Sequence, residues 1–293
     1  MLSTKPKPEQ ALVSTSWLKE NLANPNIRIL DCTTFMTSRP VGASMTRSGR
    51  DHWASGHIPG SQYLDVILDL SNPAPNRPYA LASEQSITRT LNAMGIGDTH
   101  HIILYGTAHP SMVTRAWWAL KASGFSKVSI LNGGWETWLT EKHSVSTEMS
   151  HYEPVQSTPS RNQALIADIQ DVENAISDEN TYLVNALSPE QFAGSSGSHY
   201  GRPGRIPNSL NLPANSLLTP DAYTFLPLDA LAAQCEKAGL IDNNKRVITY
   251  CGGGIAASAT LFALYRLGWP HLSLYDLSLL EWSNDLSKPM VVS

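Results

Sequence analysis

The stretch RVITYCGGGIAASATLFALYRLGW, residues 246–269, sets out a strand, a loop and a helix in that order. Residues 246–250 are rich in β-branched and aromatic side chains, which favour a strand. Three glycines follow Cys251, and apolar residues then recur at helical spacing. This order of elements is typical of a parallel α/β sheet, and it places Cys251 where the strand ends.

A second copy of this arrangement lies in the first half of the chain. Residues 101–138, HIILYGTAHPSMVTRAWWALKASGFSKVSILNGGWETW, again place a short strand before a loop and an apolar helix. Tyr105 corresponds to Tyr250 and Trp138 to Trp282, at offsets of 145 and 144 residues. Such nearly equal offsets indicate an internal duplication with one small gap. We therefore expect an α/β fold with two tandem domains, each a parallel sheet flanked by helices.

A further pair of similar segments, GHIPGSQYL at 56–64 and GRIPNSLNL at 204–212, lies within the same two halves. The residues between the halves are rich in Ser, Thr, Pro and Gln without an apolar period, which is typical of a linker. We expect an N-terminal domain over 1–145, a linker over 146–161 and a C-terminal domain over 162–293. The first domain also contains a long loop before GHIPG, whose length fits either a lid or interface element or a surface insertion.

The composition indicates a packed globular protein. The 293 residues are 42% hydrophobic and 16% charged, and the formal net charge of −4 gives no general attraction to nucleic acid. No window approaches the ~20 consecutive apolar residues of a membrane span, and the N-terminus lacks the apolar stretch of a signal peptide. The three cysteines are few and far apart, which favours a reducing compartment. We expect a cytoplasmic protein that binds neither nucleic acid nor membrane.

The glycines after the strand allow two kinds of anion site. As a dinucleotide-binding loop, Gly252–Gly254 and the residues after them match G-x-G-x-x-A, and Asp276 ends the next strand, where a ribose-binding carboxylate is expected. The duplicated loop, YGTAHPSMV at 105–113, keeps the architecture but loses the glycine pattern, which weakens this interpretation. Dinucleotide binding through Gly252–Gly254 stays as an alternative.

The second interpretation is a site that holds a thiolate. Glycine reaches positive φ angles at no steric cost, so the successive N–H groups of such a loop can point at one anion. The positive end of the helix that begins near Ile255 adds to this field. Both effects favour a thiolate over a thiol, so Cys251 is predicted to be a nucleophile. Cys32 and Cys235 lack such a loop and are predicted to be buried and inert.

Four motifs in this order, GHIPG, LNGGWETW, YCGGGIAAS and YDLSLLEW, resemble the two-domain rhodanese-type sulfurtransferases, the family of thiosulfate and 3-mercaptopyruvate sulfurtransferases. The resemblance covers nearly the whole chain and implies two tandem rhodanese-like domains. The first would be catalytically inactive, with Gly106 in place of the nucleophile, and the second would carry the catalytic Cys251. The resemblance implies no metal and no cofactor. It maps the substrate-binding loop onto Gly252, Gly253, Gly254, Ile255 and Ala256.

The resemblance also implies a reaction. The thiolate of Cys251 would take a sulfane sulfur from a small anionic donor, 3-mercaptopyruvate or thiosulfate, and form a persulfide. The outer sulfur would then pass to cyanide, a thiol or a thioredoxin-like protein dithiol. Arg202 and Arg205, beside the segment where the family places substrate-binding arginines, are predicted to bind the anion, because guanidinium groups suit carboxylate and sulfonate.

The chain departs from the family pattern at several positions. The loop lacks the Arg and Lys of thiosulfate-specific members, and Gly253 and Ala256 lack the hydroxyls typical of mercaptopyruvate-specific members. Leu277 and Leu279 stand where the last motif usually has Gly and Trp. These departures motivate another alternative, a non-enzymatic sulfur-relay or protein-interaction module with the rhodanese fold.

Overall fold

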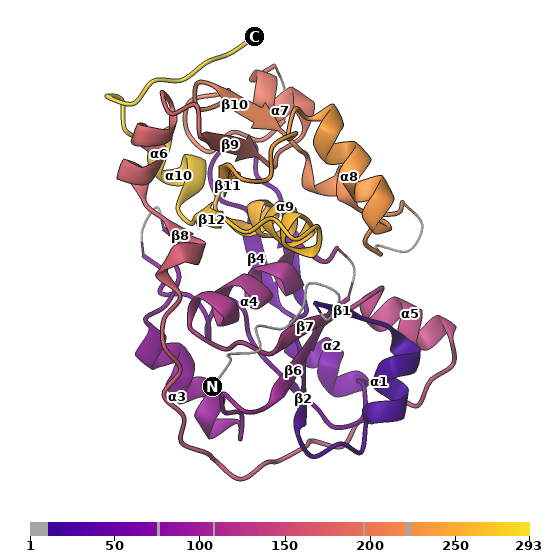
Figure 1. The fold of residues 1–293 in the computed structure, drawn as a ribbon. Coiled ribbons are helices and arrows are strands. Elements are labelled where there is room, and N and C mark those ends of the chain that lie inside the picture. The colour runs from indigo at the N-terminus through magenta and orange to yellow at the C-terminus, as the bar shows by residue number, and fades with distance from the viewer. Residues whose placement is uncertain (1–10, 75–76, 108, 196, 221–223) are drawn as a thin grey trace.

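The computed structural model describes residues 11–74, 77–107, 109–195, 197–220 and 224–293. The two halves of the chain form two lobes, with the first half below and the second half above in Figure 1. Each lobe is built around a parallel sheet with helices on both faces, so the predicted α/β fold with two tandem domains is confirmed. None of the helices in the described ranges is both long and apolar enough to cross a membrane.

The sheet of the first domain has the strand order β1-β7-β6-β2-β5 among the described residues, and every neighbouring pair is parallel. The strands are β1 (Leu12–Val13), β2 (Ile27–Asp31), β5 (Ser61–Tyr63), β6 (His101–Tyr105) and β7 (Val128–Leu131). The helices around them are α1 (Thr15–Asn21), α2 (Arg50–Ser55), α3 (Glu84–Ala93), α4 (Ser111–Ala122) and α5 (Gly134–Thr140).

The sheet of the second domain repeats this topology, with the order β8-β12-β11-β9-β10 and parallel pairing throughout. The strands are β8 (Ile166–Ala167), β9 (Thr181–Asn185), β10 (Ser209–Asn211), β11 (Arg246–Tyr250) and β12 (Leu272–Tyr275). The helices are α6 (Ile169–Ala175), α7 (Pro189–Ala193), α8 (Leu228–Lys237), α9 (Ile255–Arg266) and α10 (Ser278–Trp282), with short 3-10 turns at Gln163–Leu165 and Ala214–Leu217.

The duplicated motifs make the same buried hydrogen bond in both domains. The buried tyrosine that ends the central strand accepts a hydrogen bond from the backbone of the isoleucine in GHIPG or GRIPN. Ile58 N–H donates to the Tyr105 hydroxyl at 3.3 Å, and Ile206 N–H donates to the Tyr250 hydroxyl at 3.1 Å. Both tyrosines and both isoleucines are fully buried, so the motif fixes the turn that leads into the edge strand.

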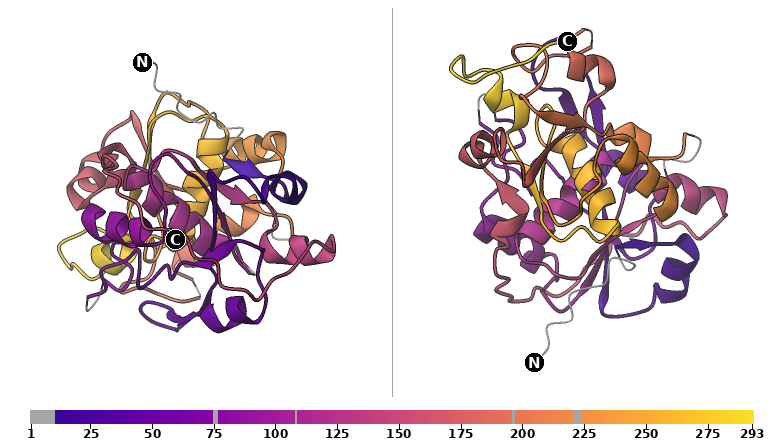
Figure 2. Two further views of the ribbon diagram at one scale, coloured as in Figure 1. Left: turned by 90° about the horizontal axis from the view of Figure 1, so that it is seen from below. Right: turned by 45° about the horizontal axis from the view of Figure 1, so that its top comes forward.

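The two domains meet along α4 and α9, which lie side by side at the centre of the molecule in both views of Figure 2. Nearly every residue of the two helices is buried, because each covers its own sheet on one face and the other helix on the opposite face. Thr114 and Ser258, which occupy corresponding positions, share a hydrogen bond of 2.8 Å. The Trp117 ring meets the Phe262 ring edge-on, with centroids 5.0 Å apart.

Two backbone contacts across the domain boundary are reciprocal. Leu81 N–H donates to the Asp276 carboxylate at 2.7 Å, and Phe225 N–H donates to the Asn132 side chain at 3.1 Å. Leu81 corresponds to Phe225, and Asn132 to Asp276, at the offset of 144 residues that relates the duplicated halves. The two domains are therefore packed with approximate twofold symmetry.

The long loop of the first domain forms an antiparallel hairpin of β3 (Thr34–Thr37) and β4 (Met45–Ser48). Its tip reaches the second domain, where Gly42 N–H donates to His199 O at 2.7 Å and His199 N–H donates to Pro40 O at 3.0 Å. In Figure 1 the hairpin rises from the lower lobe beside the strands of the upper one. The loop is thus an interface element, one of the two roles that its length allowed.

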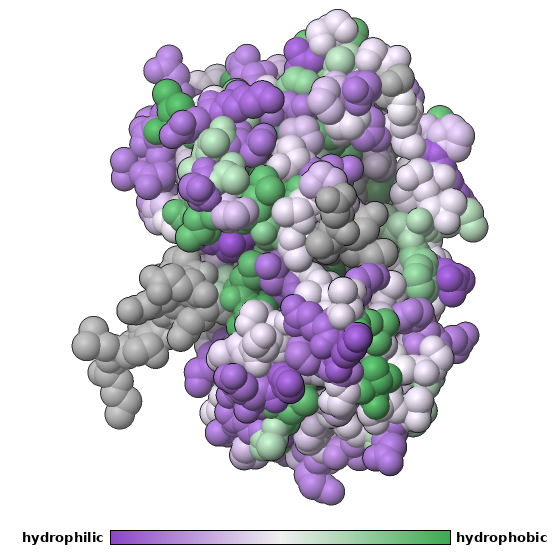
Figure 3. Space-filling view, turned by 90° about the vertical axis from the view of Figure 1, so that its right-hand side faces the viewer, coloured by the Kyte–Doolittle hydropathy of each residue, from purple (hydrophilic) through white to green (hydrophobic). Residues whose placement is uncertain are grey.

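No helix or strand is assigned between residues 146 and 161, the segment predicted to be a linker, and it runs along the first domain. The Tyr152 hydroxyl donates to Gly60 O at 2.9 Å, and the Arg28 guanidinium lies 4.0 Å from the centre of the Tyr152 ring. On the face drawn in Figure 3, hydrophilic residues cover much of both lobes, and apolar residues are exposed at the boundary between the lobes and in separate patches on each lobe.

Candidate active site

Cys251 directly follows β11, and its side chain is only 2% exposed. The glycines after it are required by their surroundings. Gly254 has φ +79°, a left-handed conformation that favours glycine, and α9 begins at the next residue. A Cβ at Gly252 would collide with the Tyr200 ring, and one at Gly253 would press on Leu280 and Tyr79. The loop predicted from the glycines is therefore a tight turn at the strand-to-helix junction.

The start of α10 holds the backbone of this loop in place. Leu279 N–H donates to Cys251 O at 3.1 Å, and Leu280 N–H donates to Gly252 O at 2.8 Å. The Ser278 hydroxyl accepts from Cys251 N–H at 3.1 Å and donates to Tyr275 O at 2.8 Å. The unusual Leu279 takes part through its main chain, so this departure from the family motif leaves the contact intact.

The N–H groups of Gly252, Gly253 and Gly254 donate to no acceptor among the described residues. The first N–H groups of α9 also lack intrahelical acceptors, as in any α-helix. These donors belong to the residues that directly follow Cys251, and unpaired N–H groups at the start of a helix can stabilise negative charge on a nearby sulfur.

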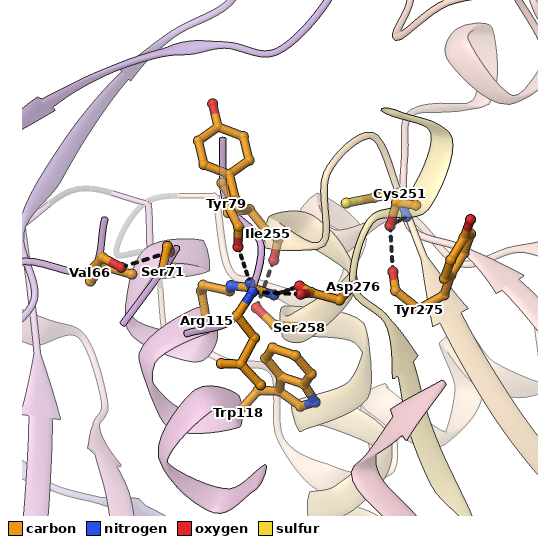
Figure 4. Close-up of polar contacts among 12 residues, drawn as sticks. Val66, Ser71, Tyr79, Arg115, Trp118, Cys251, Ile255, Ser258, Tyr275 and Asp276 are labelled. Atoms are coloured by element: carbon orange, nitrogen blue, oxygen red, sulfur yellow. Dashed lines mark hydrogen bonds and ion pairs between the residues drawn. The ribbon is translucent and has the colours of Figure 1, made fainter. Parts of the chain in front are cut away.

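Cys251 lines a cavity of about 420 Å³ at the boundary between the domains. In Figure 4 its sulfur points toward the side on which Tyr79 of the first domain lies. Residues of the first domain form one wall: Thr34, Phe35, Met36, Ser38, Ser44, Tyr79, Thr107, His109, Ser111 and Met112. The second domain contributes Leu187, Tyr200, Asn215, Cys251, Gly253, Ile255 and Ala256. Of the predicted loop residues, Gly253, Ile255 and Ala256 thus face the cavity together with Cys251.

Two tyrosines flank the cysteine. Burial raises the pKa of Tyr79 to about 12, and burial together with the charge of a Cys251 thiolate raises the pKa of Tyr200 further. Both phenols are therefore protonated at neutral pH. The Tyr79 hydroxyl donates to Ser44 O of the hairpin at 2.5 Å, which ties this side chain to the cavity wall.

The cavity histidine is neutral. Burial lowers the pKa of His109, and both ring nitrogens have partners. Its Nε2–H donates to the Asn215 side chain at 2.8 Å, and its Nδ1 accepts from Ser111 N–H at 3.2 Å. This pair of contacts fixes one neutral tautomer.

A buried ion pair lies behind the loop. Arg115 of α4 contacts the Asp276 carboxylate at 2.6 Å and donates to Tyr79 O at 2.5 Å, as Figure 4 shows. Asp276, to which the dinucleotide alternative assigns a ribose, is thus bonded to Arg115 and to the Leu81 backbone. This pair joins the two domains and supports the backbone of Tyr79.

Arg202 and Arg205, predicted to bind the substrate, do not border the cavity in the described part of the chain. Arg202 donates to the carbonyl oxygens of Ser283 and Asp285 at 2.9 and 2.7 Å. Arg205 donates to Ser293 Oγ at 3.2 Å and lies over the Phe192 ring. The Arg202 guanidinium thus contacts main-chain carbonyls near the C-terminus, and the Arg205 guanidinium contacts Phe192 and Ser293. The substrate-binding role of these arginines stays a prediction.

The other two cysteines lie away from the cavity. Both are buried, and burial raises the pKa of Cys32 well above its usual value and that of Cys235 to about 11. In the first domain, Gly106 occupies the position of Cys251, and a Cβ there would lie 3.0 Å from Val113. Among the described residues, no three His, Cys, Asp or Glu side chains are grouped so that they could hold a metal ion.

Sequence reasoning found the cysteine and its loop but missed Tyr79, Tyr200 and Arg115. No motif marks these side chains. Tyr79 and Arg115 reach the site only when the two domains are packed together, and Tyr200 reaches it from a distant loop of the second domain that packs against Gly252. One signal was present in the sequence, the correspondence between the segments around Leu81 and Phe225, which both cross the boundary.

Comparison with known proteins agrees with this architecture. The model of the rhodanese-like domain matches residues 14–141 and again residues 168–285. The chain is thus a protein with two tandem α/β domains, of which the second carries a cysteine loop. It belongs to the rhodanese family and contains two copies of the domain.

Relatives extend over most of the chain. Thiosulfate sulfurtransferase of Bos taurus is 29% identical over 282 residues, 93% of this chain and 92% of the relative. Sulfur carrier protein TtuD of Thermus thermophilus is 29% identical over 294 residues, 96% of each chain. The crystal structure of SseA from Escherichia coli, described as a 3-mercaptopyruvate sulfotransferase, has a TM-score of 0.79 at 25% identity and covers 91% of this chain and 98% of SseA. The relatives support sulfur transfer in general.

Proposed function

We propose that this protein is a sulfurtransferase that carries sulfane sulfur as a persulfide on Cys251. The proposal rests on one observation, the position of the Cys251 side chain at the cavity between the domains. Of the three cysteines, Cys251 alone lines the cavity between the domains, and it precedes a loop with unpaired N–H groups. A persulfide is a stronger acid than a thiol, so unpaired N–H donors in the loop after Cys251 suit both states of the cysteine.

The proposed reaction has two half-reactions. The Cys251 thiolate attacks the outer sulfur of the donor, and the donor's bond to that sulfur breaks, with the electron pair leaving on sulfite or pyruvate enolate. A thiol, cyanide or thioredoxin-like dithiol then attacks the outer sulfur of the persulfide, and Cys251 leaves as a thiolate. The N–H groups from Gly252 to Ala256 stabilise the charge on sulfur in both steps.

The donors expected from the sequence, 3-mercaptopyruvate and thiosulfate, are the first to test, because relatives carry both names. The protein is incubated with each donor and cyanide, and thiocyanate is followed. The peptide that contains Cys251 should gain the mass of one sulfur when the donor is added alone. Cys251→Ser should abolish both signals, and Cys235→Ser, at a buried position away from the cavity, should keep them. Turnover by Cys251→Ser would contradict the proposal.

A second candidate is a sulfur relay that passes its persulfide only to a partner protein. The loop without hydroxyl or cationic side chains motivates it, and the Thermus thermophilus relative is named as a sulfur carrier protein. A relay would load one sulfur on Cys251 and release it to a reduced protein dithiol, but it would not turn over with cyanide. The same loading and turnover measurements therefore separate the two candidates.

A further inference from the structure

The wall of the cavity around Cys251 contains no cationic side chain in the described part of the chain. None of the lining residues there is Lys or Arg, and the cavity histidine, His109, is neutral. Both donors of the proposed reaction are anions, and an anion that leaves water needs a partner of opposite charge or hydrogen-bond donors. A cation that meets the donor therefore has to reach in from the rim of the cavity.

Three arginines that could be considered for this task already have partners. Arg115 is paired with Asp276, and Arg77 is paired with Glu281. Arg202 donates to main-chain carbonyls near the C-terminus. Each of these guanidinium groups would have to give up its present contacts to bind a donor, so the cation is better sought elsewhere.

The hairpin of β3 and β4 gives one side of the cavity a basic rim. Residues 33–50 include three arginines and no acidic residue, whereas the whole chain has a formal net charge of −4. Arg39 and Arg47 are exposed, and neither forms an ion pair with any carboxylate that the structure describes. Arg50 is directed elsewhere, because its guanidinium lies 4.8 Å from the centre of the Tyr63 ring, which does not line the cavity.

The backbone on both sides of Arg39 is fixed next to the cavity. Ser38 lines the cavity, and Pro40 O accepts a hydrogen bond of 3.0 Å from the second domain. Burial raises the pKa of Tyr79 to about 12, and the charge of Arg39 acts against this rise whereas that of a Cys251 thiolate adds to it. The Tyr79 phenol thus lies within electrostatic reach of both the rim arginine and the cysteine.

Arg47 is held against a side chain of the cavity wall. It pairs with Phe35 across the hairpin, and its guanidinium lies 4.3 Å from the centre of the Phe35 ring. Phe35 in turn lines the cavity. A guanidinium that stacks on an aromatic ring keeps the N–H groups at its edge available, and these suit the paired oxygens of a carboxylate or sulfonate.

We propose that Arg39 and Arg47 bind the anionic group of the sulfur donor at the rim of the cavity while the sulfur of the donor reaches Cys251. This inference rests on the proposed function, since it assigns donor recognition in the first half-reaction. The family resemblance places substrate-binding arginines in the second domain. Here the task falls to the first domain, which lacks a nucleophile, and the bond changes are those of the proposed reaction.

The charge selectivity of the rim can be measured without sulfur transfer. Iodoacetate carries a carboxylate beside its reactive carbon, whereas iodoacetamide carries a neutral amide there. The ratio of their alkylation rates at Cys251, assigned by mass spectrometry, reports whether a cation meets the carboxylate. In the double variant Arg39→Gln/Arg47→Gln, the iodoacetate rate should fall about tenfold or more and the iodoacetamide rate should change less than about twofold. An unchanged ratio would overturn the proposal.

Two further variants separate charge at the rim from other effects. Arg39→Lys/Arg47→Lys keeps both charges, and its iodoacetate rate should lie between those of wild type and the double Gln variant. Arg89→Gln removes one positive charge from α3, where Arg89 lines a separate hollow with residues 157–159, and the ratio should stay as in wild type. An equal loss with Arg89→Gln would show that only net charge matters, which contradicts the proposal.

Steady-state kinetics test the same arginines with a donor. Thiosulfate is varied at saturating cyanide, and the double Gln variant should raise its KM about tenfold or more with kcat within about threefold of wild type. This split is expected because the arginines bind the donor but touch no bond that breaks. A fall in kcat together with a lower urea midpoint would mark them as structural and overturn the proposal. A tenfold rise in KM for Arg202→Gln alone would do the same, because it returns donor recognition to the second domain.

The two measurements distinguish failure of this proposal from failure of the proposed function. If wild-type Cys251 takes up no sulfur from either donor, the proposed function fails, and the alkylation ratio still decides whether the hairpin binds an anion. If the double Gln variant keeps both the wild-type ratio and the wild-type KM while Cys251 loads sulfur, this proposal fails and the proposed function stands.

Discussion

The strand-to-helix loops after β6 and β11 occupy equivalent positions in the two domains but differ in sequence and in their role at the cavity. In the second domain the loop begins with Cys251 and glycines whose N–H groups are unpaired. In the first domain the corresponding loop begins with Gly106, and its Thr107 and His109 line the cavity that faces the cysteine. The strand order in the sheet and the order of the helices along the chain are the same in both domains. The loop without a nucleophile has therefore become part of the wall around the other loop.

The largest effect is expected when the cysteine is moved from the end of β11, at residue 251, to the end of β6, at residue 106. Cys251→Ser should lower sulfur transfer by about 10³-fold or more, because the nucleophile is lost. Adding Gly106→Cys to that variant should restore nothing, because a Cβ at Gly106 lies 3.0 Å from Val113 and the loop lacks the glycines. Thiocyanate formation is the readout. Recovery of even one tenth of the wild-type rate in the double variant would show that both loops can support the chemistry.

The second test compares the two equivalent positions at the domain boundary. Asp276 is charged and paired with Arg115, whereas Asn132 is neutral. Arg115→Met leaves Asp276 buried without its cation, and we expect a loss of about 3–5 kcal/mol in the free energy of unfolding. Asn132→Ala removes only the neutral hydrogen bond to Phe225 and should cost about 1 kcal/mol. Urea denaturation measures both. Similar losses in the two variants would mean that the ion pair contributes no more than its neutral counterpart.

The turn at the start of α9 allows a matched pair of glycine substitutions. Gly254 and Gly268 have nearly equal φ angles, +79° and +81°, but a Cβ at Gly254 would strike Asp276 O whereas one at Gly268 would meet open space. Gly268→Ala should cost about 1–2 kcal/mol from backbone strain alone. Gly254→Ala should cost about 2 kcal/mol more and slow alkylation of Cys251, since the collision displaces the loop. Equal costs would refute the claim that close packing requires Gly254.

The smallest effect is expected at the predicted substrate arginines. The Arg202 guanidinium bonds to main-chain carbonyls near the C-terminus, so Arg202→Gln should change the KM for thiosulfate by less than about threefold. Arg205→Gln should behave alike, because Arg205 contacts Phe192 and Ser293. Steady-state kinetics with a folding control decides the matter. A tenfold rise in KM at unchanged kcat would establish these arginines as anion-binding residues.

The fold could be predicted because its signals are local or repeated. Strand and helix periodicity, the offset between Tyr105 and Tyr250, and the GHIPG and GRIPN segments together define two copies of one topology. The loop after Cys251 could be predicted for the same reason, since Gly254 has the positive φ angle that a glycine-rich turn permits.

The walls of the site could not be predicted, because they depend on how the two domains pack. Tyr79 and the hairpin of β3 and β4 belong to the first domain, and nothing in their local sequence relates them to a cysteine far along the chain. For Arg202 and Arg205 the sequence predicts a role at the site, but neither side chain lines the cavity. They stand next to a family motif in the sequence, but their side chains turn toward the C-terminal segment.

The paired bonds from Leu81 to Asp276 and from Phe225 to Asn132 also bear on the history of the molecule. An isologous contact between identical subunits consists of bonds that occur twice, with the same two partners exchanged. When two such subunits are fused end to end and then diverge, each bond survives once per half at equivalent positions, as it does here. The boundary between the two domains accordingly has the symmetry of an isologous homodimer interface, although only one of its two halves carries the cysteine.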